Sequence, residues 1–237
     1  MIPIVVVPTY NERPNIATLV AELTRIPGLQ VLIVDDDSPD GTGKEADRIA
    51  AASHGRVSVL HRTGPRGLGR SYVDGLRHAL ADGATHVLQM DADLSHDPAD
   101  IPRLLEASET ADLVIGSRYV RGGELRNWPL HRLLLSAFAN MYVRSITQMP
   151  IHDCTSGFRC WRRELLTRIP LARMVSDGYA FQVELTWEAH QAGRPIREIP
   201  IVFVERRQGA SKMSGRVIVE SAMLPWRLIT RRAGSDR

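Results

Sequence analysis

The sequence is poor in cysteine, and its two cysteines form no known motif. Five residues separate Cys154 from Cys160, a spacing that matches no zinc or redox site. Two thiols exclude a disulfide-stapled scaffold and fit a reducing compartment, so we expect both to be packing residues. Aromatic residues make up only 5% of the 237 positions, charged residues 24% and apolar residues 43%. This composition is typical of a soluble globular protein and excludes a disordered or collagen-like chain.

Long hydrophobic runs are also absent. No stretch of about 18 uncharged apolar residues occurs, so the sequence predicts no membrane-spanning helix. The best candidates are residues 133–143 and 217–229, and Glu220 and Arg227 interrupt the second. No basic start precedes an apolar run at the N-terminus, which argues against a signal peptide.

Lysine is nearly missing, so arginine carries almost all of the positive charge. The formal net charge is +3, but residues 205–237 hold eight basic and three acidic residues, a local charge of +5. Residues 1–204 therefore carry −2. This asymmetry indicates an anionic partner at the C-terminal end, such as a phosphate group, a membrane surface or nucleic acid, with a solvated helix face as the alternative. Arginine suits phosphate because its guanidinium makes two-pronged contacts.

The first half of the chain alternates between two hydrophobic patterns. Short β-branched runs predict strands at 4–7, 31–34, 57–60, 86–90 and 113–115. Segments with helical spacing of apolar residues lie between them, at 15–23, 41–52, 68–80 and 98–107. Strands that alternate with helices predict an α/β fold, with a mostly parallel sheet covered by helices on both faces.

After residue 116 the pattern changes to longer amphipathic segments. Helices are expected at 128–149, 181–191 and 216–231, the last with a break at Pro225. Strands are expected at 158–161 and 195–204. No segment rich in proline, glycine or serine marks a domain boundary, so we expect one large domain with a C-terminal helical appendage.

Polar motifs follow four of the predicted strands, at residues 8–12, 35–41, 91–93 and 116–119. In an open α/β sheet, ligands bind beyond the carboxyl ends of the strands. The four motifs therefore predict one site in a crevice at this edge of the sheet.

Asp91 and Asp93 stand two residues apart at the end of an apolar strand. Such carboxylates can share a hard cation, Mg²⁺ or Mn²⁺, which also takes substrate phosphates and neutralises a diphosphate leaving group. The alternative is a pair of helix-capping aspartates, because Asp97 and Pro98 open the next helix.

Three consecutive carboxylates, Asp35, Asp36 and Asp37, end the second strand. Like charges so close together are costly unless a ribose hydroxyl, a base N–H group or a metal uses them. Asp40 has an alternative role in a turn or helix cap. The glycine-rich residues 64–69 precede a helix and could bind an anion through backbone N–H groups. They follow the third strand and lack the G-x-G-x-x-G spacing, which disfavours a nicotinamide-cofactor fold.

These motifs resemble those of the family 2 glycosyltransferases of the GT-A fold. The matching strings are P-T-Y-N-E at 8–12, V-D-D-D-S-P-D-G-T at 34–42, R-G-L-G at 66–69, M-D-A-D-L-S-H-D-P at 90–98 and G-S-R-Y at 116–119. Later strings are more specific and resemble the dolichol-phosphate (polyprenol-phosphate) mannose synthases: N-W-P-L-H-R at 127–132, D-C-T-S-G-F-R at 153–159 and R-x-x-G-x-S-K-M at 206–213. The resemblance covers nearly the whole chain.

The resemblance implies a metal-dependent enzyme that transfers mannose, with inversion, from GDP-mannose to a polyprenyl monophosphate. It implies that the donor is held by Pro8, Tyr10, Glu12, Asp35, Asp36, Asp40 and Ala92. Asp91, Asp93 and Ser95 would bind Mg²⁺ or Mn²⁺, although some relatives have glutamine in place of the serine.

The same resemblance assigns the remaining basic residues. Arg118 and Arg132 would hold the acceptor phosphate. Arg206 or its neighbour Arg207, with Ser211 and Lys212, would lie on a loop that closes on the diphosphate, and an exposed basic turn is the alternative. A phosphate monoester has a second pKa of about 6, so the acceptor is already an anionic nucleophile at neutral pH. We therefore predict no obligatory protein base.

The expected organisation follows from these roles. Residues 1–215 form the catalytic domain, with a nucleotide-sugar half at 1–120 and an acceptor half at 121–215, and residues 216–237 form a basic amphipathic helix. Apolar residues on one face of the helices at 128–149 and 216–231 suit a membrane interface, with packing on the body as the alternative. We expect a peripheral protein at the cytoplasmic face of the membrane. Many relatives continue into transmembrane helices beyond the position of Arg237, so a membrane-anchoring partner subunit is also expected.

Two other readings stay open. An enzyme with the same lipid acceptor but UDP-glucose or another nucleotide sugar as donor would carry the same motifs. A non-catalytic subunit that binds nucleotide sugar or lipid phosphate would have lost a D-x-D carboxylate or the loop cations, and neither is missing. Nucleic acid is not an expected partner, because three aspartates stand at the mouth of the crevice.

Overall fold

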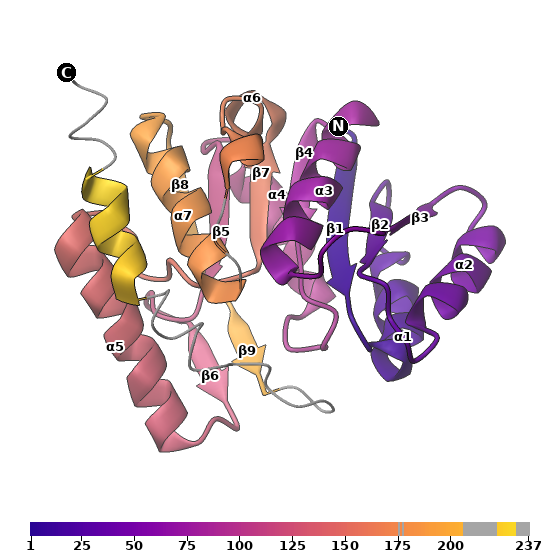
Figure 1. Cartoon of the computed structure of the whole chain (residues 1–237), viewed down its shortest axis with the longest axis horizontal. Coiled ribbons are helices and arrows are strands. Elements are labelled where there is room, and N and C mark those ends of the chain that lie inside the picture. Colours follow the sequence, from indigo (N-terminus) through magenta and orange to yellow (C-terminus); the bar gives the residue numbers. More distant parts are fainter. Residues whose placement is uncertain (175, 177, 206–221, 231–237) are drawn as a thin grey trace.

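The computed structural model describes residues 1–174, 176, 178–205 and 222–230. A seven-stranded sheet in the order β3-β2-β1-β4-β7-β5-β8 runs through its centre (Figure 1). Its strands are β1 (Pro3–Thr9), β2 (Gln30–Asp35), β3 (Val57–His61), β4 (His86–Gln89), β5 (Leu113–Ser117), β7 (Arg159–Arg162) and β8 (Ile196–Pro200). All neighbours are parallel except β7, which is antiparallel to both β4 and β5. The predicted α/β fold with a mostly parallel sheet is confirmed.

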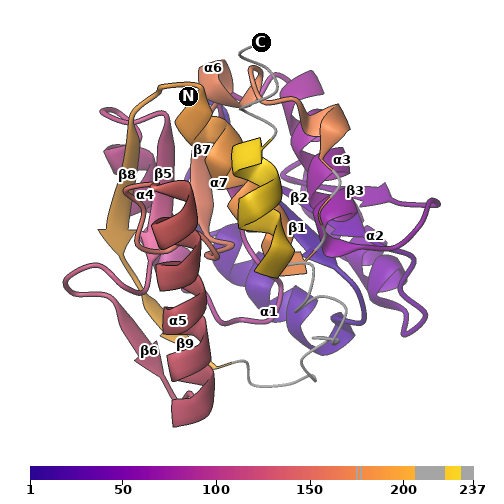
Figure 2. The ribbon, with the colours of Figure 1, turned by 60° about the vertical axis from the view of Figure 1, so that its left-hand side comes forward.

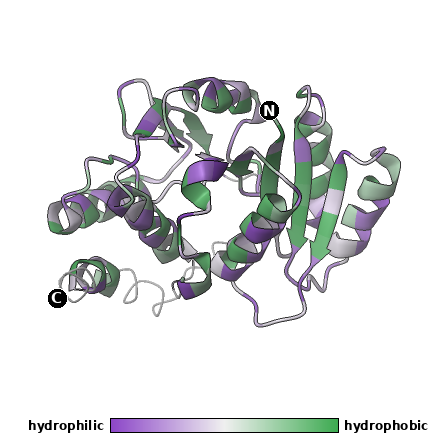
Figure 3. Cartoon of the chain, turned by 90° about the horizontal axis from the view of Figure 1, so that it is seen from above, coloured by the Kyte–Doolittle hydropathy of each residue, from purple (hydrophilic) through white to green (hydrophobic). Residues whose placement is uncertain are grey.

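Helices cover both faces of the sheet (Figure 2). They are α1 (Arg13–Leu23), α2 (Thr42–Ala52), α3 (Leu68–Ala81), α4 (Ile101–Ala107), α5 (Leu130–Thr147) and α7 (Gly178–Gln191), with short turns at η1 (Pro98–Asp100), α6 (Arg163–Leu166) and η2 (Leu171–Arg173). Residues of α3, α5 and α7 build one hydrophobic core, and residues of α1, α2 and α4 build the other. The two cores bury the inner strands of the sheet, whereas the edge strands β3 and β8 are partly exposed. The hydrophobic colour of the inner strands stands out in Figure 3.

Helix α3 lies against the sheet at Gly75. A Cβ atom there would lie 2.4 Å from Val6 Cγ1 and 2.8 Å from Val34 Cγ2. The missing side chain lets the helix backbone approach β1 and β2 closely. This approach brings the first half of α3, with Tyr72, close to the carboxyl end of β4.

The predicted strand at 195–204 is two strands in two sheets. β8 pairs with β5, whereas β9 (Val202–Val204) pairs in parallel with β6 (Glu124–Arg126) in a separate two-stranded sheet. The change occurs at Ile201, whose N–H donates to Ser117 O while its carbonyl accepts from Glu124 N. The prediction of one strand was wrong because the alternating pattern continues through the change of partner. β6 was not predicted, since three mostly exposed residues carry no periodic signal.

The last described segment is a helix over residues 222–230 that packs on α5. Tyr142 Oη donates to Ala222 O at 2.9 Å and accepts from Trp226 Nε1 at 3.0 Å. The helix runs through Pro225, so the predicted break there was wrong. Proline in the first turn of the described stretch removes no hydrogen bond within that stretch. The rest of the predicted helix at 216–231 lies outside the described residues.

Candidate active site

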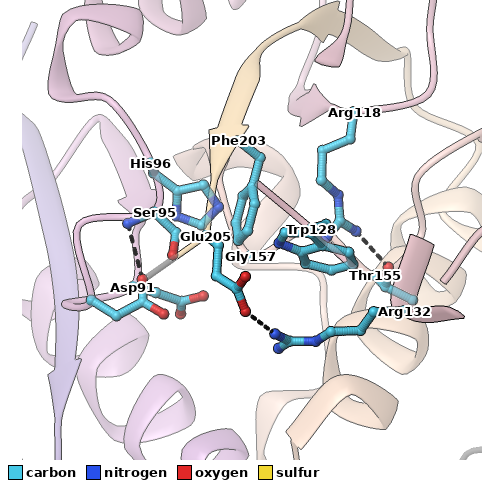
Figure 4. Close-up of a pocket in the computed structure, with 11 residues that line it drawn as sticks. Asp91, Ser95, His96, Arg118, Trp128, Arg132, Thr155, Gly157, Phe203 and Glu205 are labelled. Carbon is cyan, nitrogen blue, oxygen red and sulfur yellow. Dashed lines mark hydrogen bonds and ion pairs between the residues drawn. The ribbon is translucent and has the colours of Figure 1, made fainter. Parts of the chain in front are cut away.

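The carboxyl end of β4 opens into a pocket that gathers residues from distant parts of the chain (Figure 4). The residues that line it are Asp91, Asp93, Ser95, His96, Arg118, Trp128, Arg132, Thr155, Gly157, Phe203 and Glu205. The fold therefore brings the D-x-D pair together with both arginines predicted to bind an acceptor phosphate. This pocket, at the predicted edge of the sheet, is the candidate active site.

Asp91 is held in place by a side chain of α3. Tyr72 Oη donates to Asp91 Oδ1 at 2.8 Å. Burial, and then the nearby Asp91 charge, raise the pKa of Tyr72 well above its ordinary value, so the phenol remains a donor. Gly157 lies on the other side, where a Cβ atom would be 3.0 Å from Asp91 Oδ2. The carboxylate is thus fixed in direction with no room for an added side chain.

The turn after Asp91 fits a divalent cation. Asp93 Oδ1 accepts from the backbone N–H of Ser95 at 3.1 Å. Ser95 Oγ and His96 Nδ1 are buried and have no hydrogen-bond partner within the described part of the chain. A buried hydroxyl without a partner beside two carboxylates matches the oxygen ligands that Mg²⁺ and Mn²⁺ prefer.

Two carboxylates and one hydroxyl do not complete a coordination shell. Within the described ranges, no group of three or more His, Cys, Asp or Glu residues is arranged to hold a metal. A cation here would take its other ligands from water and substrate phosphates, as Mg²⁺ commonly does. His96 packs between two aromatic rings, with ring-centroid distances of 5.0 Å to Phe158 and 5.1 Å to Phe203. Burial lowers the pKa of His96, which favours the neutral imidazole.

Arg118 is fixed by a buried carboxylate. Its Nε and Nη2 atoms donate to the two oxygens of Asp153, each at 2.7 Å, and Nη2 also donates to Thr155 Oγ1 at 2.8 Å. Burial by itself would raise the pKa of Asp153, but the charge and hydrogen bonds of Arg118 outweigh it and keep the pKa below its ordinary value. The guanidinium is therefore oriented before any ligand arrives.

An indole ring separates the two arginines of the pocket. The Trp128 ring centroid lies 5.9 Å from the Arg118 guanidinium carbon and 4.8 Å from that of Arg132. Arg132 Nη1 donates to Glu205 Oε1 at 2.5 Å. The tryptophan thus orients two cations toward one pocket, where a phosphate can be bound by both.

The loop that holds Arg118 is itself tied to a buried arginine in β7. Arg159 Nε donates to Ser156 O at 2.7 Å, and Nη2 donates to Cys154 O at 2.9 Å. Burial lowers the pKa of Arg159 to about 10. Both cysteines are free and buried, as expected of packing residues.

Residues predicted to hold the nucleotide lie at the ends of β1 and β2. Asp36 forms a buried ion pair with Arg62 and accepts from Gly67 N at 2.8 Å. Tyr10 lies under the Arg66 guanidinium at 5.0 Å, and Arg66 pairs with Asp37 at 2.6 Å. Two arginines therefore dock the glycine-rich loop onto the carboxylates that directly follow β2.

The other predicted nucleotide residues hold the local backbone. Asp35 is buried and accepts from Thr9 Oγ1 and Ser38 N. Asp40 accepts from Thr42 N at 2.9 Å and from Arg13 N at 3.3 Å, which orders the start of α2. Glu12 Oε2 accepts from Asn15 Nδ2, Pro8 is a buried residue of β1, and Ala92 is buried between the two aspartates. None of these residues is among those that line the pocket of Figure 4, although Ala92 lies between two that do. The predicted loop residues Arg206, Ser211 and Lys212 lie outside the described residues.

The sequence matches the family model described as glycosyl transferase family 2 over residues 4–169. The chain is a family 2 glycosyltransferase. Two curated relatives agree. It is 49% identical over 220 residues to the polyprenol monophosphomannose synthase of Mycolicibacterium smegmatis, which covers 92% of this chain and 83% of that relative. It is 45% identical over 219 residues to the undecaprenyl-phosphate mannosyltransferase of Micrococcus luteus, which covers 92% of this chain and 90% of the relative.

Solved structures confirm the GT-A fold of this glycosyltransferase. Glucosyl-3-phosphoglycerate synthase from Mycobacterium tuberculosis, in complex with Mn²⁺, UDP-glucose and phosphoglyceric acid, matches with a TM-score of 0.69 at 19% identity, over 98% of this chain and 79% of that one. A mannosyltransferase from Pyrobaculum calidifontis, in complex with GDP-mannose and Mn²⁺, matches with a TM-score of 0.59 at 21% identity, over 98% and 73% of the two chains. Both of these solved structures contain Mn²⁺.

Several residues that line the pocket of the glycosyltransferase, or that hold its lining residues in place, were not assigned a catalytic or binding role from the sequence. They are Tyr72, Trp128, Asp153, Phe203 and Glu205. Trp128 and Asp153 lie inside the strings N-W-P-L-H-R and D-C-T-S-G-F-R, so their motifs were a usable signal. Tyr72 and Phe203 carried none, because each is an apolar position of a predicted helix or strand. Glu205 directly precedes the basic loop motif, and only the fold shows that its side chain turns toward Arg132.

Proposed function

We propose that the chain transfers mannose from GDP-mannose to a polyprenyl monophosphate, with inversion at the anomeric carbon. The observation that carries this proposal is the pocket that joins Asp91 and Asp93 to Arg118 and Arg132. One side can bind a cation and a diphosphate, and the other can bind a second phosphate. The names of the two curated relatives support a polyprenyl phosphate as the acceptor.

Each end of the pocket has a separate task. Asp91, Asp93 and Ser95 would hold Mg²⁺ or Mn²⁺, which when bound would neutralise the charge of the leaving diphosphate. Arg118 and Arg132 hold the acceptor phosphate and overcome its repulsion from the donor. An oxygen of the acceptor phosphate attacks the anomeric carbon of mannose, the bond from that carbon to the diphosphate oxygen breaks, and GDP leaves. No base is needed, because the phosphate dianion has no proton to lose. The product is then a β-mannosyl phosphate, and an α-mannosyl product by NMR would contradict inversion.

We further propose the division of labour along the chain. Residues 1–120 bind the nucleotide sugar through Pro8, Tyr10, Glu12, Asp35, Asp36, Asp40 and Ala92. Residues 121–215 bind the acceptor, with Arg206, Ser211 and Lys212 closing on the diphosphate. Residues 216–237 form a basic amphipathic segment.

The exposed side chains of two neighbouring helices support a membrane surface as a partner. We call them the exposed apolar face: Leu130, Leu134, Leu135, Phe138 and Met141 on α5, with Met223 and Trp226 on helix 222–230. Leu224 and Leu228 of helix 222–230 pack into the core instead, which is the alternative that the sequence left open for this helix. No helix in the described ranges is long and apolar enough to cross a bilayer. We propose that the enzyme is peripheral, at the cytoplasmic face of the membrane. We also propose that a partner subunit can anchor it there.

The test incubates the purified chain and liposomes with polyprenyl phosphate and labelled GDP-mannose or UDP-glucose. We expect label from GDP-mannose in the organic phase, lost with EDTA and restored by Mg²⁺ or Mn²⁺. Asp93→Ala should abolish transfer, whereas Asp82→Ala, an exposed aspartate at the end of α3, should not. Label from UDP-glucose alone would contradict GDP-mannose as the donor and support polyprenyl phosphate as the acceptor. No label from either donor would favour a non-catalytic binding subunit.

A further inference from the structure

The candidate active site carries a carboxylate that its proposed substrates do not need. Three acidic residues line the pocket, Asp91, Asp93 and Glu205, against two basic ones, Arg118 and Arg132. Both proposed substrates are anions, so extra negative charge in the pocket opposes their binding. Asp91 and Asp93 are explained by a cation, and Glu205 is not.

The two arginine–carboxylate pairs of the pocket differ in strength. The Arg118–Asp153 pair is buried, with side chains 5% and 0% exposed, and it has two hydrogen bonds between the charged groups. The Arg132–Glu205 pair has one such hydrogen bond, and its side chains are 23% and 30% exposed. A buried pair is costly to break, whereas a partly exposed pair contributes little to stability. Glu205 can therefore leave its arginine, and Asp153 cannot.

The backbone at Glu205 is held by hydrogen bonds to two other segments, and the Arg132 side chain is held by a ring. Glu205 N donates to Arg126 O at 3.1 Å, and Val204 N donates to Ser95 O at 3.1 Å. Arg132 leans on the Trp128 ring. Only the carboxylate and the tip of the guanidinium can separate, and Figure 4 shows the carboxylate at the arginine tip inside the pocket. An incoming phosphate monoester needs the same N–H groups, with which it makes strong charge-assisted hydrogen bonds.

We propose that Glu205 is an internal competitor for the acceptor phosphate. Its carboxylate occupies Arg132 before the acceptor binds and leaves when a phosphate monoester arrives. A phosphate with a charge of about −1.5 to −2 displaces it, whereas an anion of single charge does so poorly. Glu205 thus makes the acceptor site selective for phosphate monoesters over carboxylates. The identity of the acceptor in this inference rests on the proposed function.

The test compares Glu205→Gln, which keeps the size of the side chain and removes its charge, with Glu124→Gln. Glu124 pairs with Arg126 in β6 of the two-stranded sheet, and both side chains are exposed. Glu124 does not line the pocket. Inorganic phosphate, acetate and geranyl monophosphate are titrated into each protein by calorimetry, and acceptor KM and kcat are measured. For Glu205→Gln we expect the Kd of both phosphates and the acceptor KM to fall about two- to five-fold. We expect the Kd of acetate to fall by at least the same factor, and kcat not to fall. Glu124→Gln should behave as wild type in every measurement.

A double variant checks that the effect passes through Arg132. On an Arg132→Gln background, Glu205→Gln should lower the phosphate Kd by much less than it does in the wild type, because only the repulsion by its charge remains. A Kd that is unchanged or higher in Glu205→Gln alone, or a lower kcat, would overturn the proposal and make Glu205 a residue that positions Arg132. Tighter phosphate binding without mannosyl transfer by the wild type would keep this inference and reject the proposed function. Mannosyl transfer by the wild type, without tighter phosphate binding in Glu205→Gln, would support the proposed function and reject this inference.

Discussion

Asp153 holds Arg118 through two hydrogen bonds of 2.7 Å, across 35 residues of sequence. The carboxylate also accepts from the backbone N–H of Arg118 at 3.0 Å and from Thr155 Oγ1 at 3.2 Å. A fully buried aspartate thus joins the end of β5 to the loop before β7. The same contact orients the guanidinium that faces the pocket, so stability and activity depend on one pair.

Asp153→Asn should strongly destabilise the protein. The amide keeps the shape of the side chain but leaves the Arg118 charge without its buried partner, which costs about 3–5 kcal/mol in comparable cases. Urea denaturation at neutral pH measures the loss in free energy of unfolding. Glu124→Gln, which removes an exposed pair with Arg126, should leave the urea midpoint unchanged. An equally stable Asp153→Asn protein would show that the pair adds nothing to the fold.

The same pair should contribute to acid unfolding. Because the folded-state pKa of Asp153 lies below its ordinary value, its stabilising effect is complete above the unfolded pKa of about 3.9. The effect is lost as the pH falls through the lower folded-state pKa. The stability difference between wild type and Asp153→Asn should therefore be largest near neutral pH and shrink below about pH 4. A difference that grows on acidification, in urea titrations at several pH values, would contradict this assignment.

Tyr72→Phe should raise the metal concentration needed for activity, with little change in the free energy of unfolding. The substitution removes the hydrogen bond to Asp91, but the ring remains stacked on Phe181, 5.9 Å away. Loss of a hydrogen bond that orients a metal ligand typically costs about 10- to 100-fold in metal affinity or activity. The measurement is the Mn²⁺ concentration that gives half-maximal transfer. Tyr142→Phe, whose hydroxyl contacts helix 222–230, is the matched control and should keep the wild-type value.

Gly75→Ala should destabilise the fold by overpacking. The new methyl group would meet Val6 Cγ1 at 2.4 Å and Val34 Cγ2 at 2.8 Å, so α3 must move off the sheet. Overpacking of this kind costs about 1–3 kcal/mol. Thermal unfolding should show a lower midpoint, whereas Gly64→Ala, where no atom lies within 4 Å of the added Cβ, should not. Equal midpoints for the two variants would mean that the helix can shift without cost.

The exposed apolar face should bind liposomes. Phe138 and Trp226 are 58% and 53% exposed, and replacing both by serine removes apolar area that would otherwise enter the membrane interface. Burying a fully exposed side chain of this kind is worth about 1.5–3 kcal/mol, and these two, each about half exposed, together offer about as much. The membrane affinity measured by flotation with anionic liposomes should therefore fall by at least about ten-fold. Ile2→Ser, an exposed apolar residue outside this face, should float as wild type. Undiminished flotation of the double variant would assign membrane binding to another surface.

Most of the elements could be predicted from local pattern alone. The β-branched run before Pro8 and the helical spacing of Ile16, Leu19 and Leu23 are set by neighbours in sequence, and both elements are confirmed. The position of Asp91 and Asp93 at a strand end is equally local. Parallel order follows from alternation of strands and helices, since a crossover helix returns the chain to the same edge.

Contacts between distant segments were decided by the tertiary structure. The antiparallel insertion of β7 between β4 and β5, and the change of sheet at Ile201, depend on partners far along the chain. A strand pattern states which face is buried but not which strand lies beside it.

The candidate active site shows the same division. The family resemblance predicted that Arg118 and Arg132 hold the acceptor phosphate, and the strand pattern placed only Arg118 at the end of a strand. Their carboxylate partners, Asp153 and Glu205, lie 35 and 73 residues away, and no local spacing encodes such a pairing. The sequence determines which side chains carry charge, and the packed fold determines which charges meet, because burial and distance arise only when the segments come together.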